Sequence, residues 1–273
     1  MVHALTPPRP SGDTRQRADL LRHCEALIVA DAALANAAVP TGSERPRRIA
    51  TIAILASNRI EGWSGAAAFN GLVEAREAVR GTDPLARVAA LCRAHGQLAS
   101  YGVVHGAPTG TFREQEVMVA HLRAPPAQKV PALMEDWQRL YGRPGGTQAA
   151  RVLDALCAHH RLLYIHPFRD GNGRLARLDL EARLQAEGLH CGTHWAVSAA
   201  LLCQEASYRT ALAWADAPRR GDLDGRGALS EAGLAAYCTT LLVALVGEIH
   251  ERGRQAGVAC HTREQPQGFP HGR

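Results

Sequence analysis

The stretch HPFRDGNGRLAR, residues 166–177, concentrates residue types that can bind an anion. Gly171 and Gly173 permit backbone conformations that expose consecutive N–H groups, and a helical pattern begins directly after them. A helix that starts behind such a loop attracts anions through its free N–H donors and its dipole. Arg174 and Arg177 are three positions apart, so they share one helical face, where guanidinium forks suit phosphate oxygens. The pattern therefore predicts a polyphosphate site.

Other side chains of the same stretch could act on a bound phosphate. Asp170 could hold Mg²⁺, which prefers oxygen ligands and retains several waters. A neutral His166 imidazole could take a proton from an incoming hydroxyl, and Asn172 could bond a phosphate oxygen or brace the loop. Phe168 is expected to anchor the loop in the core. Together these groups suit attack of a hydroxyl on a nucleotide phosphate, without distinguishing nucleotidyl from phosphoryl transfer.

Each of these features also has an ordinary structural explanation when it is taken alone. A single histidine such as His166 is more often structural than catalytic, and a GxG pair usually marks a turn. Arginines spaced like Arg174 and Arg177 usually line a solvated helix face. The joint occurrence of all these features, in this order and at the start of a helix, favours the chemical interpretation.

The elements around this stretch are predicted to be mainly helical. Apolar residues recur at helical spacing over 147–164 before the loop and over 173–188 after it. Another helix is expected at about 46–62, ending at Gly62 as a C′ glycine. One segment departs from this pattern: valine-rich runs flank a Gly/Pro turn and predict a β-hairpin at about 103–119. The expected architecture is a mostly α helical bundle with one β-hairpin.

The composition narrows the classes of protein to which the chain could belong. The 273 residues are 46% apolar, enough for a sizeable core. A net charge of +5 with dispersed arginines and 5% aromatics argues against a nucleic-acid partner. An odd number of cysteines without CxxC spacing predicts reduced, structural thiols. No apolar signal core or membrane-length apolar run was found, so we expect a cytoplasmic protein without a membrane partner. The oligomeric state is open, a homodimer included.

The stretch 166–177 resembles the Fic signature HxFx(D/E)GNGRxxR, with a match at every defined position. The similarity continues in GTFREQEV, which looks like the end of the family's flap, and in PPAQKVPALMEDWQRLY. HWAVSAALLCQEASYRTALAWAD resembles the helices that follow the signature. The resemblance implies a Fic fold at 45–256, preceded by an N-terminal helix and linker at 1–44 and followed by a flexible tail at 257–273.

The resemblance implies an enzyme that transfers AMP from ATP to a Ser, Thr or Tyr hydroxyl of a target protein, releasing pyrophosphate. His166 would be the general base, and Asp170 would coordinate Mg²⁺ bound to the α- and β-phosphates. The hairpin at 103–119 would be the flap that pairs with the target backbone by strand addition. The anion hole would be formed by Gly171, Asn172, Gly173 and Arg174. The γ-phosphate would be held by Arg177.

A second motif, SNRIEG from Ser57 to Gly62, resembles the family's inhibitory motif (S/T)xxxE(G/N). Glu61 near a helix end could pair with Arg177, which would then be unable to hold the γ-phosphate. Such a short motif is weak by itself, and Glu61 could be an ordinary exposed acid. Its position upstream of a full signature favours the inhibitory interpretation. It suggests the class in which an inhibitory helix, here about 46–62, precedes the core on the same chain.

Three functions are compatible with these residues. The first is an autoinhibited protein adenylyltransferase. The second keeps the fold but uses Glu61 to position a water that removes AMP from a target. The third is a non-catalytic nucleotide-binding regulator with a closed site, against which His166 argues, because a binding module has no use for a base there. Variants of the first function would transfer UMP, phosphocholine or a phosphoryl group in place of AMP. The branch of the family that phosphorylates its targets departs from GNGR in the loop, and this sequence does not.

Overall fold

The computed structural model describes residues 14–37, 44–106, 110–119, 122–142, 145–217 and 231–257. Within these ranges it contains ten α-helices, two 3-10 helices and one pair of short strands, which confirms the mostly α expectation. In chain order the elements are α1 (Thr14–Asn36), α2 (Glu44–Ile60), α3 (Gly65–Val79), η1 (Pro84–Ala86), α4 (Arg87–Ser100), β1 (Met118–Val119), β2 (Leu122–Arg123), η2 (Ala127–Lys129), α5 (Val130–Tyr141), α6 (Gln148–Ile165), α7 (Asn172–Ala186), α8 (Val197–Cys203), α9 (Glu205–Ala215) and α10 (Glu231–Gln255).

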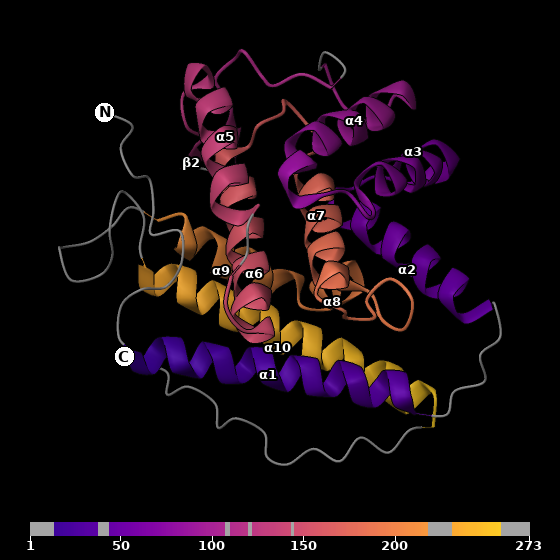
Figure 1. The fold of residues 1–273 in the computed structure, drawn as a ribbon. Helices are drawn as coiled ribbons and strands as arrows, with labels where there is room; N and C mark the ends of the chain where they lie inside the picture. The colour runs from indigo at the N-terminus through magenta and orange to yellow at the C-terminus, as the bar shows by residue number, and fades with distance from the viewer. Residues whose placement is uncertain are drawn as a thin grey trace.

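The helices α6 and α7 form the centre of the bundle, and the loop that joins them is the signature stretch (Figure 1). α6 is buried along almost its whole length, and the Trp137 indole of α5 donates a hydrogen bond to its Ala158 carbonyl at 2.9 Å. α7 contacts α2, α3, α4, α6 and α8. The loop residues are therefore positioned by the two most enclosed helices of the fold.

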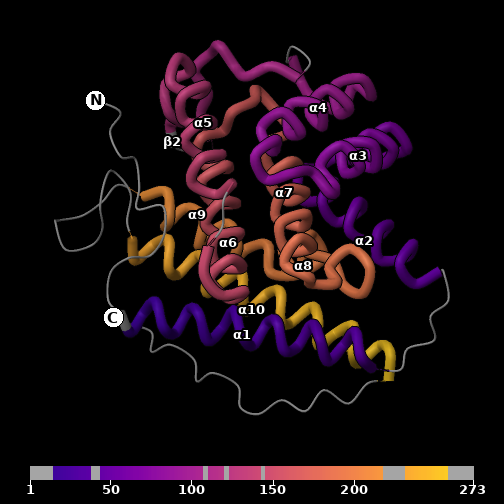
Figure 2. The backbone as a smooth tube through the Cα atoms, in the orientation of Figure 1, coloured from indigo at the N-terminus to yellow at the C-terminus, as the bar shows by residue number. Residues whose placement is uncertain are grey.

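The N-terminal helix α1 belongs to the same core. Leu20, Leu27 and Leu34 are spaced seven apart and at most 2% exposed, so they lie on one helical face. This face packs on α10 and α6, and Figure 2 shows α1 and α10 side by side along one edge of the bundle. Residues 38–43, at the end of the predicted N-terminal helix and linker at 1–44, and all of the predicted tail except Gly257 lie outside the described residues.

The helix α10 is long and apolar enough to cross a membrane by length and composition, and it is the one such helix in the part of the chain that the structure describes. Its apolar window is 61% buried. It packs against α1, α6, α8 and α9. Its hydrophobicity is therefore what a central core helix requires.

The predicted β-hairpin at 103–119 is not found at that position. β1 and β2 pair antiparallel, with Met118 opposite Arg123, so the strands are short and lie at the end of the predicted segment. The described residues before Met118 in this segment form no strand, and 107–109 lie outside the description. Arg113 supplies a physical reason, because its backbone N–H donates to the Pro167 carbonyl at 2.9 Å. That bond ties the segment to the signature loop instead of to a partner strand.

Candidate active site

The helix α6 ends at His166, whose backbone is left-handed at φ 50° and ψ 61°. Among the residues that the structure describes, His166 is the one non-glycine residue with positive φ. Such a conformation is uncommon for histidine and is held by its surroundings. Its N–H still donates to the Leu162 carbonyl at 3.1 Å. The chain therefore turns sharply at this residue and directs the following loop away from the axis of α6.

The imidazole of His166 is half-buried, with Nδ1 3.3 Å from the Leu163 carbonyl. A neutral ring that donates from Nδ1 keeps Nε2 as a proton acceptor. Burial is the main cause that lowers the pKa of His166 below its ordinary value; the Leu163 carbonyl opposes this effect and the Arg113 guanidinium adds to it. The ring is therefore neutral at pH 7, as a general base requires.

Asn172 braces the loop internally. Its Oδ1 accepts from the Phe168 N–H at 2.9 Å, and its Nδ2 donates to the Phe168 carbonyl at 2.8 Å. Phe168 is 1% exposed, as expected, and stacks on His95 with ring centroids 4.3 Å apart. Of the two roles considered for the Asn172 side chain, the structure shows the bracing of the loop. Its backbone N–H is the group that faces an anion site.

The start of α7 is an uncapped helix N-terminus. Gly171 is the N-cap residue at φ 84°, without a side-chain hydrogen bond to the first turn. The first N–H bonded back along the helix is that of Leu175, to the Gly171 carbonyl at 3.0 Å. The N–H groups of Asn172, Gly173 and Arg174 precede it and are oriented toward the end of the helix. This is the geometry that binds phosphate oxygens.

Arg174 adds positive charge next to this helix start. It is fully buried, and its Nη2 donates to the Val103 carbonyl at 2.6 Å. Its Nε and Nη1 have no hydrogen-bond partner within the described residues. The guanidinium also lies over the Trp63 ring at 5.2 Å, and Trp63 stacks on His105 at 4.8 Å. Because a buried guanidinium with two unused donors is costly, Arg174 is prepared for an anion.

Asp170 is oriented by two backbone donors. Its Oδ1 accepts from the Gly171 N–H at 2.6 Å and its Oδ2 from the His105 N–H at 2.8 Å. Each oxygen keeps a further acceptor position. No group of three or more His, Cys, Asp or Glu residues that could hold a metal occurs in the described part of the chain. A single carboxylate nevertheless fits Mg²⁺, which is commonly held by one or two carboxylates together with substrate phosphates.

The end of α2 lies directly against the start of α7. Glu61 Oε1 is 2.9 Å from Arg177 Nη1, while Ser57 accepts from Arg177 Nε at 3.0 Å through its hydroxyl and from Nη2 at 2.9 Å through its carbonyl. Arg177 is 2% exposed. A Cβ at Gly173 would collide with the Glu61 carboxylate, so this carboxylate covers the first turn of α7. The contact anticipated between the two motifs is therefore present, and it uses every nitrogen of the Arg177 guanidinium.

Several contacts position Glu61. Gly62 has φ 73° and follows the end of α2, as expected of a C′ glycine. The Asn58 amide donates to the Ala68 carbonyl at 2.8 Å, and Arg209 of α9 donates to the Ile60 carbonyl at 2.9 Å. The end of α2 is thus tied to both α3 and α9. Nothing in the local sequence around Arg209 indicated this role.

Arg113 is a second residue that sequence reasoning did not single out. Its guanidinium donates to the carbonyls of His166 at 2.7 Å and of Ile165 at 3.3 Å. It also bonds the Gln115 carbonyl at 3.0 Å and the Pro125 carbonyl. Arg113 therefore holds the strained end of α6 together with the segment that leads to β1. The sequence feature that could have pointed to Arg113 is its position in the segment GTFREQEV, which resembles the end of the family's flap.

Replacing Arg113 by alanine is expected to lower the free energy of unfolding by about 2–4 kcal/mol, because several buried carbonyls would lose a charged donor. Urea unfolding of the two proteins measures the difference. Arg123→Ala is the matched control, since the Arg123 side chain is 73% exposed and its contact with Glu116 is 3.8 Å long. Equal stability of the two variants would contradict this role for Arg113.

Three comparisons with known proteins agree on one family. Residues 85–182 match the family model described as Fic/DOC family. Curated proteins named "Protein adenylyltransferase Fic" from Drosophila ananassae and Drosophila melanogaster are each 34% identical to this chain over 79 residues. That alignment spans 29% of this chain and 16% of the relatives' length.

Solved structures share the fold over most of the chain. A Fic family protein from Desulfovibrio desulfuricans G20 superposes with a TM-score of 0.69 and 20% identity, covering 93% of this chain and 78% of the other. Fic-1 (aa134–508) from C. elegans superposes with a TM-score of 0.64 and 16% identity, covering 88% of this chain and 74% of the other. Residues 85–182 thus match the Fic/DOC family model, and the chain has the fold of these Fic family structures with the signature loop at its centre.

Proposed function

We propose that the protein is a protein adenylyltransferase whose site is held closed by its own helix α2. The observation that carries the proposal is the Glu61 carboxylate, which lies over the first turn of α7 and is paired with Arg177. The surrounding site offers uncapped N–H groups, unused guanidinium donors on Arg174 and a neutral His166. The names of the curated relatives support AMP as the transferred group.

In the open state the triphosphate of ATP would lie along the start of α7. The N–H groups of the first turn and the Arg174 donors would bind its phosphate oxygens, and Arg177, once free of Glu61, would hold the γ-phosphate. Asp170 would hold Mg²⁺, which when bound supplies charge neutralisation between the phosphates. The positive groups are prearranged, so little reorganisation is needed as charge develops on the leaving pyrophosphate.

His166 would act on the target hydroxyl. Its Nε2 takes the hydroxyl proton while the oxygen attacks the α-phosphorus of ATP, and the bond between the α-phosphorus and the pyrophosphate oxygen breaks. The products are an AMP ester of the target and pyrophosphate, and the imidazolium returns its proton to solvent. The lowered pKa of His166 keeps the ring in the base form before the attack.

The target protein would dock beside the strand pair β1–β2 and present its hydroxyl to His166. Strand addition at this edge uses backbone hydrogen bonds, so it makes little demand on the target's side chains. Met118 of β1 is 63% exposed and offers an apolar contact to such a segment. A cytoplasmic location, the lack of nucleic-acid and membrane partners, and the homodimer remain predictions.

Glu61 also favours a second candidate function, removal of AMP from a modified target. The Glu61 side chain is 33% exposed although it pairs with the buried Arg177. Its carboxylate is therefore held in place by Arg177 and is also accessible to water. Such a carboxylate can orient a water molecule for attack on a phosphodiester. In this case Glu61 would be required for turnover instead of opposing it.

Incubation of the wild-type and Glu61→Gly proteins with labelled ATP and Mg²⁺ separates these functions. α-Labelled ATP reports AMP transfer, γ-labelled ATP reports phosphorylation, and α-labelled UTP reports UMP transfer. We expect α-label on protein only with ATP, and mainly with Glu61→Gly. No label in any variant, combined with release of AMP from a pre-adenylylated target by the wild type alone, would replace the first function by the second.

The rate of transfer by Glu61→Gly is expected to rise with pH through a single base limb whose midpoint lies below 6.5. Burial lowers the pKa of His166, and removal of Glu61 takes away a negative charge that raises it. The neutral base is therefore fully formed above the midpoint and lost as pH falls through it. Initial rates at saturating ATP between pH 5 and 8 test this, and a limb above pH 7 would contradict the assignment.

A further inference from the structure

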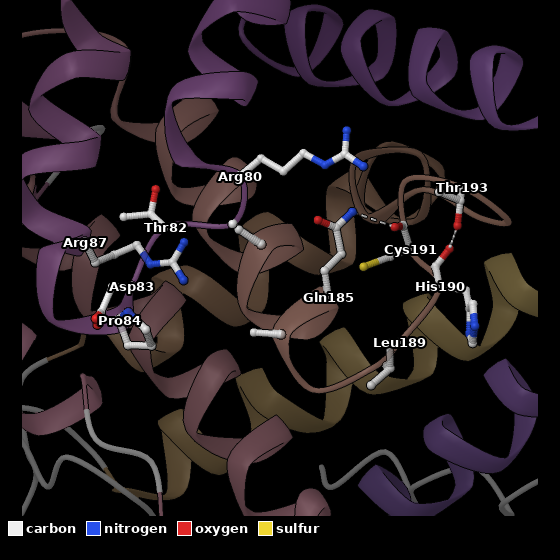
Figure 3. Close-up of a pocket in the computed structure, with 13 residues that line it drawn as sticks. Arg80, Thr82, Asp83, Pro84, Arg87, Gln185, Leu189, His190, Cys191 and Thr193 are labelled. Carbon is white, nitrogen blue, oxygen red and sulfur yellow. Dashed lines mark hydrogen bonds between the residues drawn. The ribbon is translucent and has the colours of Figure 1, made fainter.

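A second pocket lies at the opposite end of α7 from the signature loop (Figure 3). It opens between the α3–α4 connection and the last turn of α7 with the loop that follows. Its volume is about 550 Å³, within the size range of small-molecule sites. None of its lining residues belongs to the stretch 166–177 or to the SNRIEG motif. It is therefore a site separate from the one described above.

The polar wall of this pocket is dominated by two arginines. Arg80 stands at the rim with its side chain 54% exposed, and its contact with Glu77 is 3.8 Å long. Arg87 forms part of the inner wall and is 2% exposed. The acid among the lining residues, Asp83, uses its carboxylate to accept the Leu85 N–H at 2.8 Å. The pocket therefore combines an exposed cation at its mouth with a buried cation in its wall.

The neutral polar residues of the pocket use their donors on main-chain carbonyls. The Gln185 amide donates to the Cys191 carbonyl at 2.8 Å, as Figure 3 shows. The Thr82 hydroxyl donates to the Ala78 carbonyl at 3.3 Å, and the Thr193 hydroxyl to the His190 carbonyl at 2.9 Å. A ligand acceptor group would therefore be bound mainly by guanidinium nitrogens.

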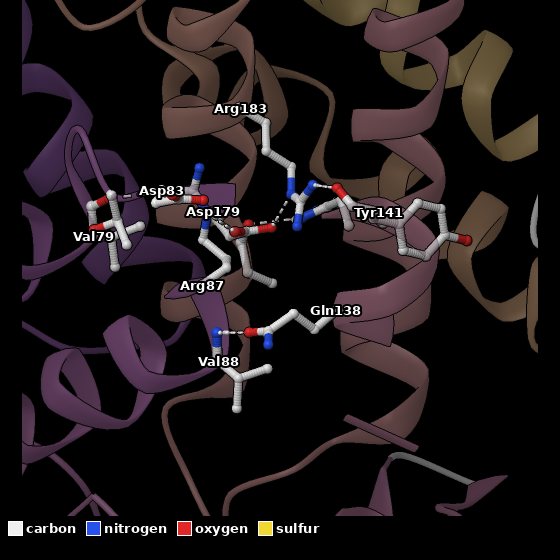
Figure 4. A network of polar contacts seen from close by, with 12 residues as sticks. Val79, Asp83, Arg87, Val88, Gln138, Tyr141, Asp179 and Arg183 are labelled. Atoms are coloured by element: carbon white, nitrogen blue, oxygen red, sulfur yellow. Dashed lines mark hydrogen bonds and ion pairs between the residues drawn. The ribbon is translucent and has the colours of Figure 1, made fainter. Parts of the chain in front are cut away.

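Two buried arginines lie behind the pocket wall and share one buried carboxylate (Figure 4). Asp179 is fully buried and faces two guanidinium groups, Arg87 Nε at 3.5 Å and Arg183 Nε at 2.8 Å. Each arginine also donates to one carbonyl, Arg87 to Val79 at 3.2 Å and Arg183 to Tyr141 at 2.8 Å. The two buried cations thus share Asp179, and Asp83 lies in the same network and adds a second negative charge beside Arg87.

Unused polar atoms mark the same place. Arg87 Nε, Arg183 Nη2 and Asp179 Oδ1 are buried without a hydrogen-bond partner in the described residues. Arg183 lies over the Trp137 ring at 4.7 Å, a contact that stabilises its charge in part. Arg87 makes no such aromatic contact within the described residues, and its guanidinium is buried at the pocket wall, where desolvation lowers its pKa. Burial of the Arg87 guanidinium is costly, and an anion in the adjacent pocket would offset part of that cost.

We propose that this pocket is a binding site for a small organic anion, with a carboxylate or phosphate group between Arg80 and Arg87. The apolar part of the ligand would lie on Leu189, Ala182 and Ala186, which form the rest of the lining. The volume is that of a site for a metabolite-sized molecule.

Backbone-amide NMR of the isotope-labelled full chain tests the proposal, with sodium succinate and sodium phosphate as probes against sodium chloride of equal ionic strength. We expect saturable shifts at residues 81–83 and 189–193. Saturation with succinate alone assigns the carboxylate class, and saturation with phosphate alone assigns the phosphate class. Shifts confined to residues 171–174 would overturn the proposal, because they report the helix start of the Fic site.

Three variants separate pocket binding from general charge effects. Arg80→Gln is expected to weaken binding about fivefold or more, since it removes one charged donor to the anion. Ala186→Leu fills the pocket without changing charge and is expected to abolish the saturable shifts. Arg93→Gln, at an exposed position of α4 outside the lining, should leave the affinity unchanged. Equal affinity in all three variants, or shifts that never saturate with either probe, would overturn the proposal.

Discussion

Replacing Glu61 by glycine is expected to raise the ATP affinity and the AMP-transfer rate, each by at least tenfold. The Glu61–Arg177 contact is a charge-assisted bond of 2.9 Å to a buried guanidinium, a class worth about 1.5–3 kcal/mol. Its removal frees Arg177 for phosphate. It also removes a negative charge from the position above Gly173, where a phosphate oxygen would be repelled.

The size of this effect depends on how strongly the closed state is favoured. A change from 1% to 99% open requires about 5.5 kcal/mol, more than one ion pair supplies. The remaining free energy would come from the space that the carboxylate now occupies over the first turn of α7. Titration calorimetry with ATP and incorporation of α-label by the same samples measure the two effects separately.

Two variants serve as controls for this experiment. Glu61→Gln keeps the volume but removes the charge, so it should fall between the wild type and Glu61→Gly. Glu74→Gln removes a carboxylate from an exposed position of α3 and should behave like the wild type. If Glu61→Gly binds ATP no better than Glu74→Gln, the inhibitory role of α2 is excluded.

Replacing His166 by asparagine in the Glu61→Gly background is expected to lower the transfer rate by about 10²–10⁴, the contribution of a general base. ATP affinity should change little, because in the proposed mechanism His166 acts on the target hydroxyl and the N-terminus of α7 would bind the phosphates. Asparagine is chosen because it tolerates the left-handed backbone at φ 50°, in which alanine would be strained.

The role of His166 is decided by the transfer rate and the ATP affinity of this variant taken together. Loss of rate with retained ATP affinity supports proton removal by His166. Loss of both in a protein that unfolds at the same urea concentration would instead assign His166 to nucleotide binding. Full retention of the rate would remove it from the mechanism, since no other neutral imidazole lies among the signature residues.

The signature loop could be predicted from the sequence because its geometry is set by neighbours within a few residues. Gly171 takes a positive φ and Phe168 is buried, both within one short stretch. The helices on either side follow from apolar periodicity. The contact between Glu61 and Arg177 spans 116 positions, and only the resemblance to a known motif pointed to it. The structure places these two side chains together, which residue spacing alone does not determine.

Tertiary packing decided the parts that sequence reasoning missed or placed wrongly. Asn172 is turned inward because its amide satisfies the backbone of Phe168, and a residue type does not reveal which of two partners it binds. The strands begin only at Met118 because Arg113 holds the preceding segment against the end of α6. Apolar periodicity shows which face of a helix is buried but not which element covers it, so polar contacts between distant segments appear only once the helices are packed.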